Sequence, residues 1–164
     1  NEMISISLRK RLKTKPNFSL KLINYKRIDP EHKNLKYTKI LNFLKKIDTT
    51  KSDIVLCKNN KILESGTSNL LFIKNNEIYS PINNFYRGTT LKFLTKKIKK
   101  IKKKNIFINS LDSYDEIIII GSGKGLVSVS SVDKPFWKRK SLKNYRILSK
   151  IYQHAITNCP RYNG

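Results

Sequence analysis

Apolar and polar residues alternate in short blocks along this chain, and the spacing inside the blocks distinguishes strands from helices. A period of two predicts a strand, and apolar residues three or four apart predict one face of a helix. Two alternating segments, 4–8 and 18–23, flank a Lys-rich turn with Pro16 and predict a hairpin. After Asp29-Pro30 a helix is expected, with one face packed on the core: Tyr37, Ile40, Leu41, Leu44 and Ile47.

The middle of the chain predicts four short strands and a second helix. Segments 53–57, 61–63, 70–74 and 77–80 are separated by turns, two of which are Asn pairs, and together predict an antiparallel meander. The helix is expected to follow Gly88-Thr89-Thr90. Its lysines stay in water, and its inward residues are Leu91, Leu94, Ile98 and Ile101.

The last third predicts two strands and a long helix. The run 117–120 is wholly apolar, which favours a strand buried on both faces, and 106–108 is a shorter strand. The helix is expected from about Ser141, as N-cap, to Ile156. Its predicted buried residues are Leu142, Tyr145, Leu148, Tyr152 and Ala155. The mixture of elements predicts an α+β fold without internal repeats.

Composition restricts the classes of partner. A chain of 164 residues suits one compact domain, and no apolar run approaches the length of a membrane helix. The formal charge of +24 suggests nucleic acid, but 28 of the 35 cations are Lys, the poorer residue for bidentate recognition. We interpret the charge as a solvated Lys coat, with attraction of an anionic substrate as the alternative. Two Cys and two His give no plausible metal site.

Two segments are suited to bind an anion. Gly121-Ser122-Gly123-Lys124-Gly125 follows a hydrophobic strand, but a nucleotide P-loop would need Gly where Ile118 stands and Ser or Thr where Gly125 stands. Free N–H groups there could still hold one phosphate. The turn Arg87-Gly88-Thr89-Thr90 opens a helix and could also hold a phosphate, although an ordinary helix capped by Thr would have the same sequence pattern. Together the two turns favour one shared phosphate.

A third segment carries a family resemblance. It runs Glu64-Ser65-Gly66-Thr67-Ser68-Asn69 and then enters an apolar strand. It resembles the signature of class IV aminotransferases, which are pyridoxal-phosphate enzymes. The resemblance implies that Glu64 contacts the pyridine nitrogen of pyridoxal 5'-phosphate, where a carboxylate keeps the ring protonated and able to accept electrons.

The other motifs follow in the order that the family has, from about Arg27 to Tyr152. His32-Lys33 resembles the segment with the Schiff-base lysine, so Lys33 is implied as the catalytic residue that also moves protons at the reacting carbon. Tyr86 stands where the family often has a Leu against the ring. The full set of cofactor-binding residues implied by the resemblance is Lys33, Glu64, Thr67, Ser68, Asn69, Tyr86, Gly88, Thr89, Thr90, Gly121 and Ser122.

The flanking residues resemble one branch of the family more than the others. Segment 122–127, with Val132-Asp133 and Trp137, is similar to 4-amino-4-deoxychorismate lyase, which releases pyruvate and gives 4-aminobenzoate for folate synthesis. Lys124 stands in place of an Arg and is implied as a contact for a substrate carboxylate. The alternative is a branched-chain or D-amino-acid aminotransferase that uses the same lysine. An alternative of another class is a basic nucleic-acid-binding module.

The resemblance also implies a domain organisation. The fold would be that of D-amino-acid aminotransferase, in which a larger C-terminal domain has a mixed sheet or open barrel with flanking helices. We expect residues 1–25 to be a remnant of the N-terminal lobe and residues 26–164 to form the cofactor-binding domain. Without most of that lobe, the chain alone should catalyse little. The complete protein is expected to be a cytoplasmic homodimer with a small anionic substrate and no membrane segment.

Overall fold

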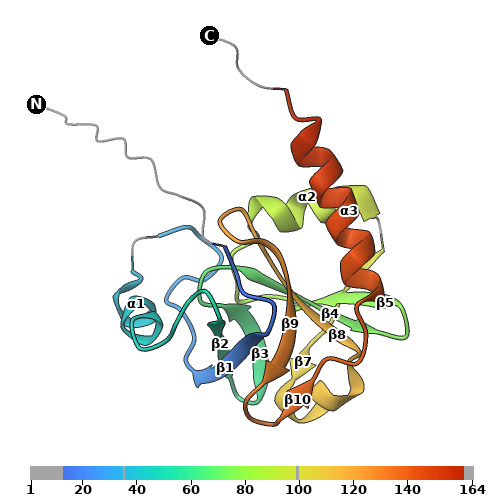
Figure 1. Cartoon of the computed structure of the whole chain (residues 1–164). Coiled ribbons are helices and arrows are strands. Elements are labelled where there is room, and N and C mark those ends of the chain that lie inside the picture. The colour runs from blue at the N-terminus through green and yellow to red at the C-terminus, as the bar shows by residue number, and fades with distance from the viewer. Residues whose placement is uncertain (1–12, 35, 99, 161–164) are drawn as a thin grey trace, which may run out of the picture.

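The structure is a computed structural model that describes residues 13–34, 36–98 and 100–160 (Figure 1). No helix in these ranges is long and apolar enough to cross a membrane. The elements, in chain order, are β1 (Phe18–Asn24), α1 (Thr38–Leu44), β2 (Ser52–Lys58), β3 (Lys61–Ser65), β4 (Asn69–Lys74), β5 (Glu77–Ser80), α2 (Thr89–Ile98), β6 (Ile101–Lys103), β7 (Ile106–Phe107), the 3-10 helix η1 (Ile108–Ser113), β8 (Glu116–Gly121), β9 (Gly125–Val132), β10 (Trp137–Lys138) and α3 (Lys143–Thr157).

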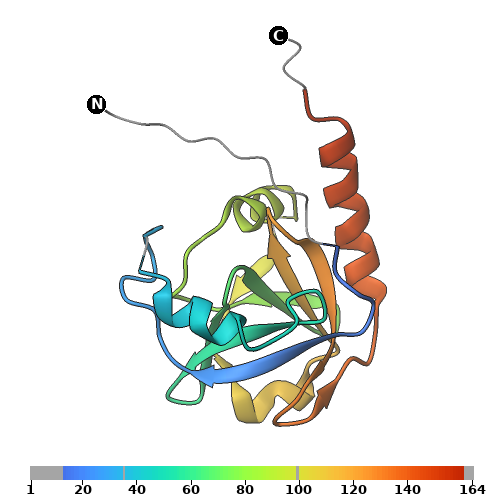
Figure 2. The same cartoon turned by 60° about the vertical axis from the view of Figure 1, so that its left-hand side comes forward.

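The described strands form a 10-stranded mixed sheet with helices on its outside (Figures 1 and 2). Its order is β6-β5-β4-β8-β9-β1-β2-β3-β7, and β10 pairs with β9. The pairs β1 with β2, β1 with β9 and β5 with β6 are parallel, and the others are antiparallel. The predicted α+β class, with a mixed sheet and flanking helices, is confirmed.

Strand β8 lies at the centre because both of its faces are apolar. Ile117 and Ile119 pack in one cluster with Phe72 and Trp137. The alternate residues of β8 face the other way, into a cluster that includes residues of α2 and α3. Full burial of one such side chain contributes roughly 1.5–3 kcal/mol, so four consecutive isoleucines fix this strand firmly in the core. The end of β8 is therefore a rigid place for polar groups.

β1 was predicted to belong to a hairpin, but its described neighbours in the sheet are two parallel strands. β1 lies between β2 and β9 and runs parallel to both, with Ser19 opposite Ser52 and Phe18 opposite Val129. The other predicted hairpin strand, residues 4–8, lies outside the described residues. The predicted domain boundary at residue 25 stays a prediction, but β1 itself is an inner strand of the sheet.

The predicted meander is wrong in its middle. β2 pairs with β3, and β4 pairs with β5, so each of these two pairs is a hairpin, as a meander requires. β3 then pairs with β7, however, and β4 pairs with β8. The four strands thus belong to two separate parts of the sheet, and the turn 66–68 connects these parts. Sequence spacing predicted the strands but not this separation, because the partners come from much later in the chain.

Helix boundaries also differ from the prediction. Ile101, expected on the inner face of the second helix, belongs to β6, and Leu41 of α1 is 50% exposed. α3 begins at Lys143 with Leu142 as N-cap, and Leu148 is its one fully buried side chain. The first turn of α3 is held by Glu116, whose buried carboxylate accepts from the backbone N–H of Asn144 and Tyr145 at 2.8 Å each.

Candidate functional site

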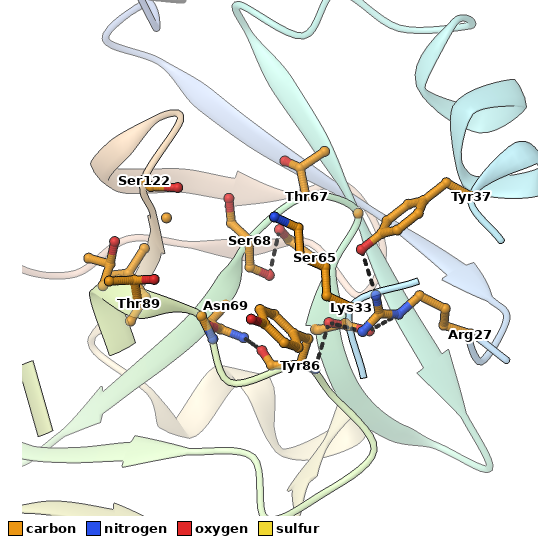
Figure 3. A pocket seen from close by; sticks show the side chains of 16 residues that line it. Arg27, Lys33, Tyr37, Ser65, Thr67, Ser68, Asn69, Tyr86, Thr89 and Ser122 are labelled. Atoms are coloured by element: carbon orange, nitrogen blue, oxygen red, sulfur yellow. Dashed lines mark hydrogen bonds and ion pairs between the residues drawn. The ribbon is translucent and has the colours of Figure 1, made fainter. Parts of the chain in front are cut away.

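A cavity of about 250 Å³ lies where four segments of the chain meet (Figure 3). The segments are the loop between β1 and α1, the turn from β3 to β4, the start of α2 and the end of β8. The structure brings together every residue that the sequence predicted for the cofactor. The complete lining is Arg27, Lys33, Tyr37, Glu64, Ser65, Gly66, Thr67, Ser68, Asn69, Tyr86, Gly88, Thr89, Thr90, Ile120, Gly121 and Ser122.

Glu64, near the end of β3, is a buried carboxylate at one end of this cavity. Its side chain is 9% exposed, and burial raises its pKa from 4.5 to about 7, against the opposing effect of Arg27. Oε2 accepts from the backbone N–H of Tyr86 at 3.3 Å. Oε1 lies 3.0 Å from Nε of Arg27 but without the alignment of a hydrogen bond, so it has no hydrogen-bond partner in the described structure. This oxygen is therefore ready to accept one from a ligand.

Arg27 is the partner of Glu64 and was not predicted from the sequence. It is 3% exposed, and its guanidinium donates to the Tyr37 hydroxyl at 2.6 Å and to the Pro30 carbonyl. The Tyr37 ring also lies beside the guanidinium, 5.3 Å from its carbon. Tyr37, predicted as plain core packing, thus orients Arg27 at the cavity. The available signal was that Arg is scarce in a chain rich in Lys, because Arg is the cation suited to several fixed acceptors.

Lys33 lies in the loop between β1 and α1, at the rim of the cavity. The residue is exposed, and its side chain extends into the cavity (Figure 3). Neighbouring polar contacts hold the loop: Asn34 donates to the carbonyls of Ile28 and Asp29 at 3.2 and 3.1 Å. A primary amine is thus placed inside the cavity, near Ser68 in this view.

Asn69 fixes the approach of the chain to α2. Its side-chain amide donates to the Tyr86 carbonyl at 2.6 Å and accepts from the Gly88 N–H at 3.0 Å. A Cβ on Gly88 would lie 3.1 Å from the Asn69 oxygen, so a larger residue would crowd this contact. Asn69 therefore presents the N-terminus of α2, with the Thr89 and Thr90 hydroxyls, to the cavity. Free N–H groups there favour an anion.

The end of β8 contacts the turn between β3 and β4. A Cβ on Gly121 would lie 2.6 Å from the Ser68 hydroxyl and 3.2 Å from the Ser68 Cβ, so any larger residue would require Ser68 to shift. Figure 3 shows Thr89 and Ser122 at one end of the cavity and Arg27 and Tyr37 at the other. The cavity thus suits a flat polar molecule with an anionic group at one end and a ring that donates a hydrogen bond at the other.

Lys124, predicted as a substrate contact, is not among the lining residues. Its Nζ lies 2.6 Å from Oδ2 of Asp53, and both side chains are buried, at 8% and 0% exposure. Asp53 was predicted only as part of a strand.

Comparison with known proteins gives one family and many similar structures. The model of the family described as amino-transferase class IV matches residues 3–132, a range that includes the whole cavity lining. Among curated proteins, none matches this chain.

Solved structures share the fold at low identity. A candidate 4-amino-4-deoxychorismate lyase from Legionella pneumophila is 18% identical with a TM-score of 0.74, over 89% of this chain and 59% of that one. A branched-chain aminotransferase from Thermoproteus uzoniensis is 11% identical with a TM-score of 0.74, over 90% and 54%. A hypothetical aminotransferase from Mycobacterium tuberculosis in its PLP-bound form is 16% identical with a TM-score of 0.72, over 88% and 57%. The chain thus spans less than two thirds of each.

Proposed function

Because this chain belongs to the class IV aminotransferase family, we propose that it is the cofactor-binding part of a pyridoxal-phosphate enzyme, with Lys33 as the lysine that binds the cofactor. The observation that carries the proposal is the cavity, which unites Lys33, Glu64 and the two anion-ready turns. A similar structure contains pyridoxal phosphate, and another, of a branched-chain amino acid aminotransferase, contains a phosphopyridoxyl-glutamate adduct.

The residues at the Glu64 end fit the cofactor ring. Among the described residues the buried Oε1 of Glu64 has no hydrogen-bond partner, and a ring N–H would supply one. Burial raises the pKa of Glu64 to about 7 in the chain alone, and a hydrogen bond from a ring N–H would favour its ionised form. Arg27 favours the ionised form of the carboxylate, which in turn favours a protonated ring. Removal of either partner would leave a buried group uncompensated.

The residues at the opposite end fit the phosphate. The start of α2 offers backbone N–H groups and the hydroxyls of Thr89 and Thr90, while the end of β8 offers Ser122. The positive end of the helix dipole adds to the attraction of an anion. We assign phosphate binding to residues 88–90 and 121–122.

Lys33 is the group that can move a proton. When bound, pyridoxal phosphate supplies an electron sink for a carbanion next to the substrate nitrogen. The flexible side chain of Lys33, at the rim, can accept the proton from that carbon and return it to another atom. For the complete enzyme we propose release of pyruvate from 4-amino-4-deoxychorismate, which the similarity to the Legionella protein supports. Transamination of branched-chain or D-amino acids is the second candidate, because it would use the same residues.

Cofactor attachment is tested with stoichiometric pyridoxal phosphate. The chain is expected to develop an absorbance band in the visible range, and borohydride reduction followed by peptide mapping should place the label on Lys33. The non-reactive analogue 4-deoxypyridoxine 5'-phosphate should prevent labelling there, which separates the site from the surface lysines. A label spread over many lysines, or an unchanged label in Lys33→Ala, would refute the assignment.

The reaction is tested in the complete enzyme by the products. Pyruvate released from 4-amino-4-deoxychorismate without a keto-acid acceptor supports the lyase. Turnover that requires an acceptor supports the aminotransferase instead. In both cases Lys33→Ala should abolish activity, whereas Lys36→Ala, an exposed lysine three positions later, should not.

A further inference from the structure

A buried ion pair lies directly behind the cavity wall, between two segments that supply lining residues. We propose that Asp53 and Lys124 are positioning residues that hold the β8–β9 turn against the turn from β3 to β4, and so fix the width of the phosphate end of the cavity. The inference rests on the proposed function, because the ligand it concerns is the phosphate of the cofactor.

The burial of this pair is the first observation. Removing two charges from water costs several kcal/mol for each ion, and apolar residues of similar size often stabilise a fold as well or better. Asp53 is nevertheless fully buried on β2, and Lys124 reaches it with its side chain over the Phe18 ring, 5.5 Å from the ring centre. Packing alone therefore does not account for two charges at this position.

The hydrogen bonds of Asp53 are the second observation. Oδ1 accepts from the backbone N–H of Ile54 at 2.8 Å. Oδ2 accepts from Lys124 Nζ at 2.6 Å and from the Thr67 hydroxyl at 3.2 Å, with the Ser65 hydroxyl 3.4 Å away. One carboxylate oxygen thus connects Lys124, from the turn after β8, to two residues that line the cavity.

The contact that the pair maintains is the third observation. Lys124 is three residues beyond Gly121, which lies so close to Ser68 that a Cβ there would force Ser68 to shift. Ser65 and Ser68 are joined in turn, since the Ser68 carbonyl accepts from both the N–H and the hydroxyl of Ser65 at 3.0 Å. If Lys124 left Asp53, the β8–β9 turn would lose its side-chain tie to residues 65–68, and the gap between Ser68 and Ser122 could widen.

Two variants separate a positioning role from simple attraction of the phosphate. Asp53→Asn adds one unit of positive charge, and Lys124→Met removes one. Simple electrostatics predicts tighter phosphate binding for the first and weaker binding for the second. A positioning role predicts weaker binding for both. The matched control is Lys102→Met, whose ion pair with Glu77 is exposed and lies outside the cavity lining.

Binding is measured by calorimetry on the full chain with 4-deoxypyridoxine 5'-phosphate and with 4-deoxypyridoxine, neither of which can react with lysines. We expect Asp53→Asn and Lys124→Met each to weaken binding of the phosphorylated analogue on the order of tenfold, because small misplacements of binding groups have effects of that size. The analogue without phosphate, and the Lys102→Met control, should change by less than about twofold.

Several outcomes would overturn the proposal. The proposal would fail if Asp53→Asn bound the phosphorylated analogue as tightly as wild type or more tightly. It would also fail if the variants lost affinity equally for the analogues with and without phosphate. If circular dichroism shows that a single variant does not fold, the double variant Asp53→Asn/Lys124→Met is used instead, because it keeps the wild-type net charge. Binding of the phosphorylated analogue by this double variant with wild-type affinity would overturn the positioning role. Wild-type protein that binds neither analogue would instead refute the proposed function, and this inference with it.

Discussion

At the scale of single residues, Arg27 and Glu64 form the most constrained part of the site. The planar guanidinium reaches Glu64, the Tyr37 hydroxyl and the Pro30 carbonyl, which a lysine ammonium on its flexible stem could not do with the same fixed geometry. The pair is also incomplete, because no residue in the described ranges donates an aligned hydrogen bond to Glu64 Oε1. A carboxyl that is buried, paired and still short of one hydrogen bond should respond strongly to pH.

The first prediction concerns this response. Burial raises the pKa of Glu64 to about 7, so the folded chain binds this proton more tightly than the unfolded chain. The contribution to the unfolding free energy is therefore fully present below about pH 4.5 and is lost as the pH rises through about 7, with a total on the order of 3 kcal/mol. Glu64→Gln cannot titrate, so its stability relative to wild type should rise between about pH 5 and about pH 8.

Thermal denaturation of the chain without cofactor measures this difference. Glu77→Gln is the control, because hydrogen bonds from Lys102 and Tyr79 lower the pKa of the exposed Glu77, which therefore titrates below this range. Parallel pH profiles for wild type and Glu64→Gln would show that burial does not raise the pKa of Glu64.

At the scale of elements, the junction between β8 and the turn 66–68 leads to the second prediction. In Gly121→Ala the new Cβ would lie 2.6 Å from Ser68 Oγ and 3.2 Å from its Cβ. Such crowding should cost roughly 1–3 kcal/mol of stability and weaken binding of 4-deoxypyridoxine 5'-phosphate. Ser68→Gly in the same chain removes both contacts and should restore most of the stability.

Gly123 offers a matched control in the same turn. A Cβ there meets no atom of the described residues within 4 Å, so Gly123→Ala should leave both stability and binding near the wild-type values. Equal effects of the two alanine substitutions would mean that the flexibility of the turn, and not the contact with Ser68, is what matters.

The third prediction concerns the attachment of α3 to the sheet. The buried Glu116 carboxylate at the start of β8 accepts from two backbone N–H groups and the side-chain amide of Asn144. Glu116→Ala should therefore lower the unfolding free energy by about 2 kcal/mol, since helix N–H groups lose their acceptor. Chemical denaturation monitored by circular dichroism measures it. Glu77→Ala, at an exposed ion pair, should cost far less, and a similar loss for both would contradict the role of Glu116.

The strands and helices were easier to predict from the sequence than the pairings and contacts between them. The run of isoleucines in β8 and the apolar face of α2 depend on local spacing, and both are present in the structure. The pairing of β4 with β8 and the contact of Arg27 with Glu64 join residues that are far apart in sequence, and no local pattern contains that information. The family motifs grouped the cavity residues in the prediction, because the order of the motifs implies that segments far apart in the sequence meet. They did not include Asp53.

At the scale of the whole molecule, the charge of +24 leads to the fourth prediction. If the lysines mainly attract small anions, the association rate of 4-deoxypyridoxine 5'-phosphate should fall roughly tenfold between low and high salt. The rate for 4-deoxypyridoxine should hardly change. Stopped-flow fluorescence measures both. Tight binding of a single-stranded oligonucleotide that falls steeply with salt, together with no binding of the cofactor analogue, would contradict the interpretation as a solvated coat and favour the nucleic-acid alternative.

The position of β1 between β2 and β9 has a consequence for biosynthesis. β2 follows β1 closely along the chain, whereas β9 is made more than a hundred residues after Phe18, and the Ser130 hydroxyl donates to the Phe18 carbonyl at 2.9 Å. During translation one edge of β1 therefore stays open until β9 has left the ribosome, and such late, distant pairing slows folding and exposes strands to aggregation. Chaperone dependence should accordingly be greatest for nascent chains that end before β9.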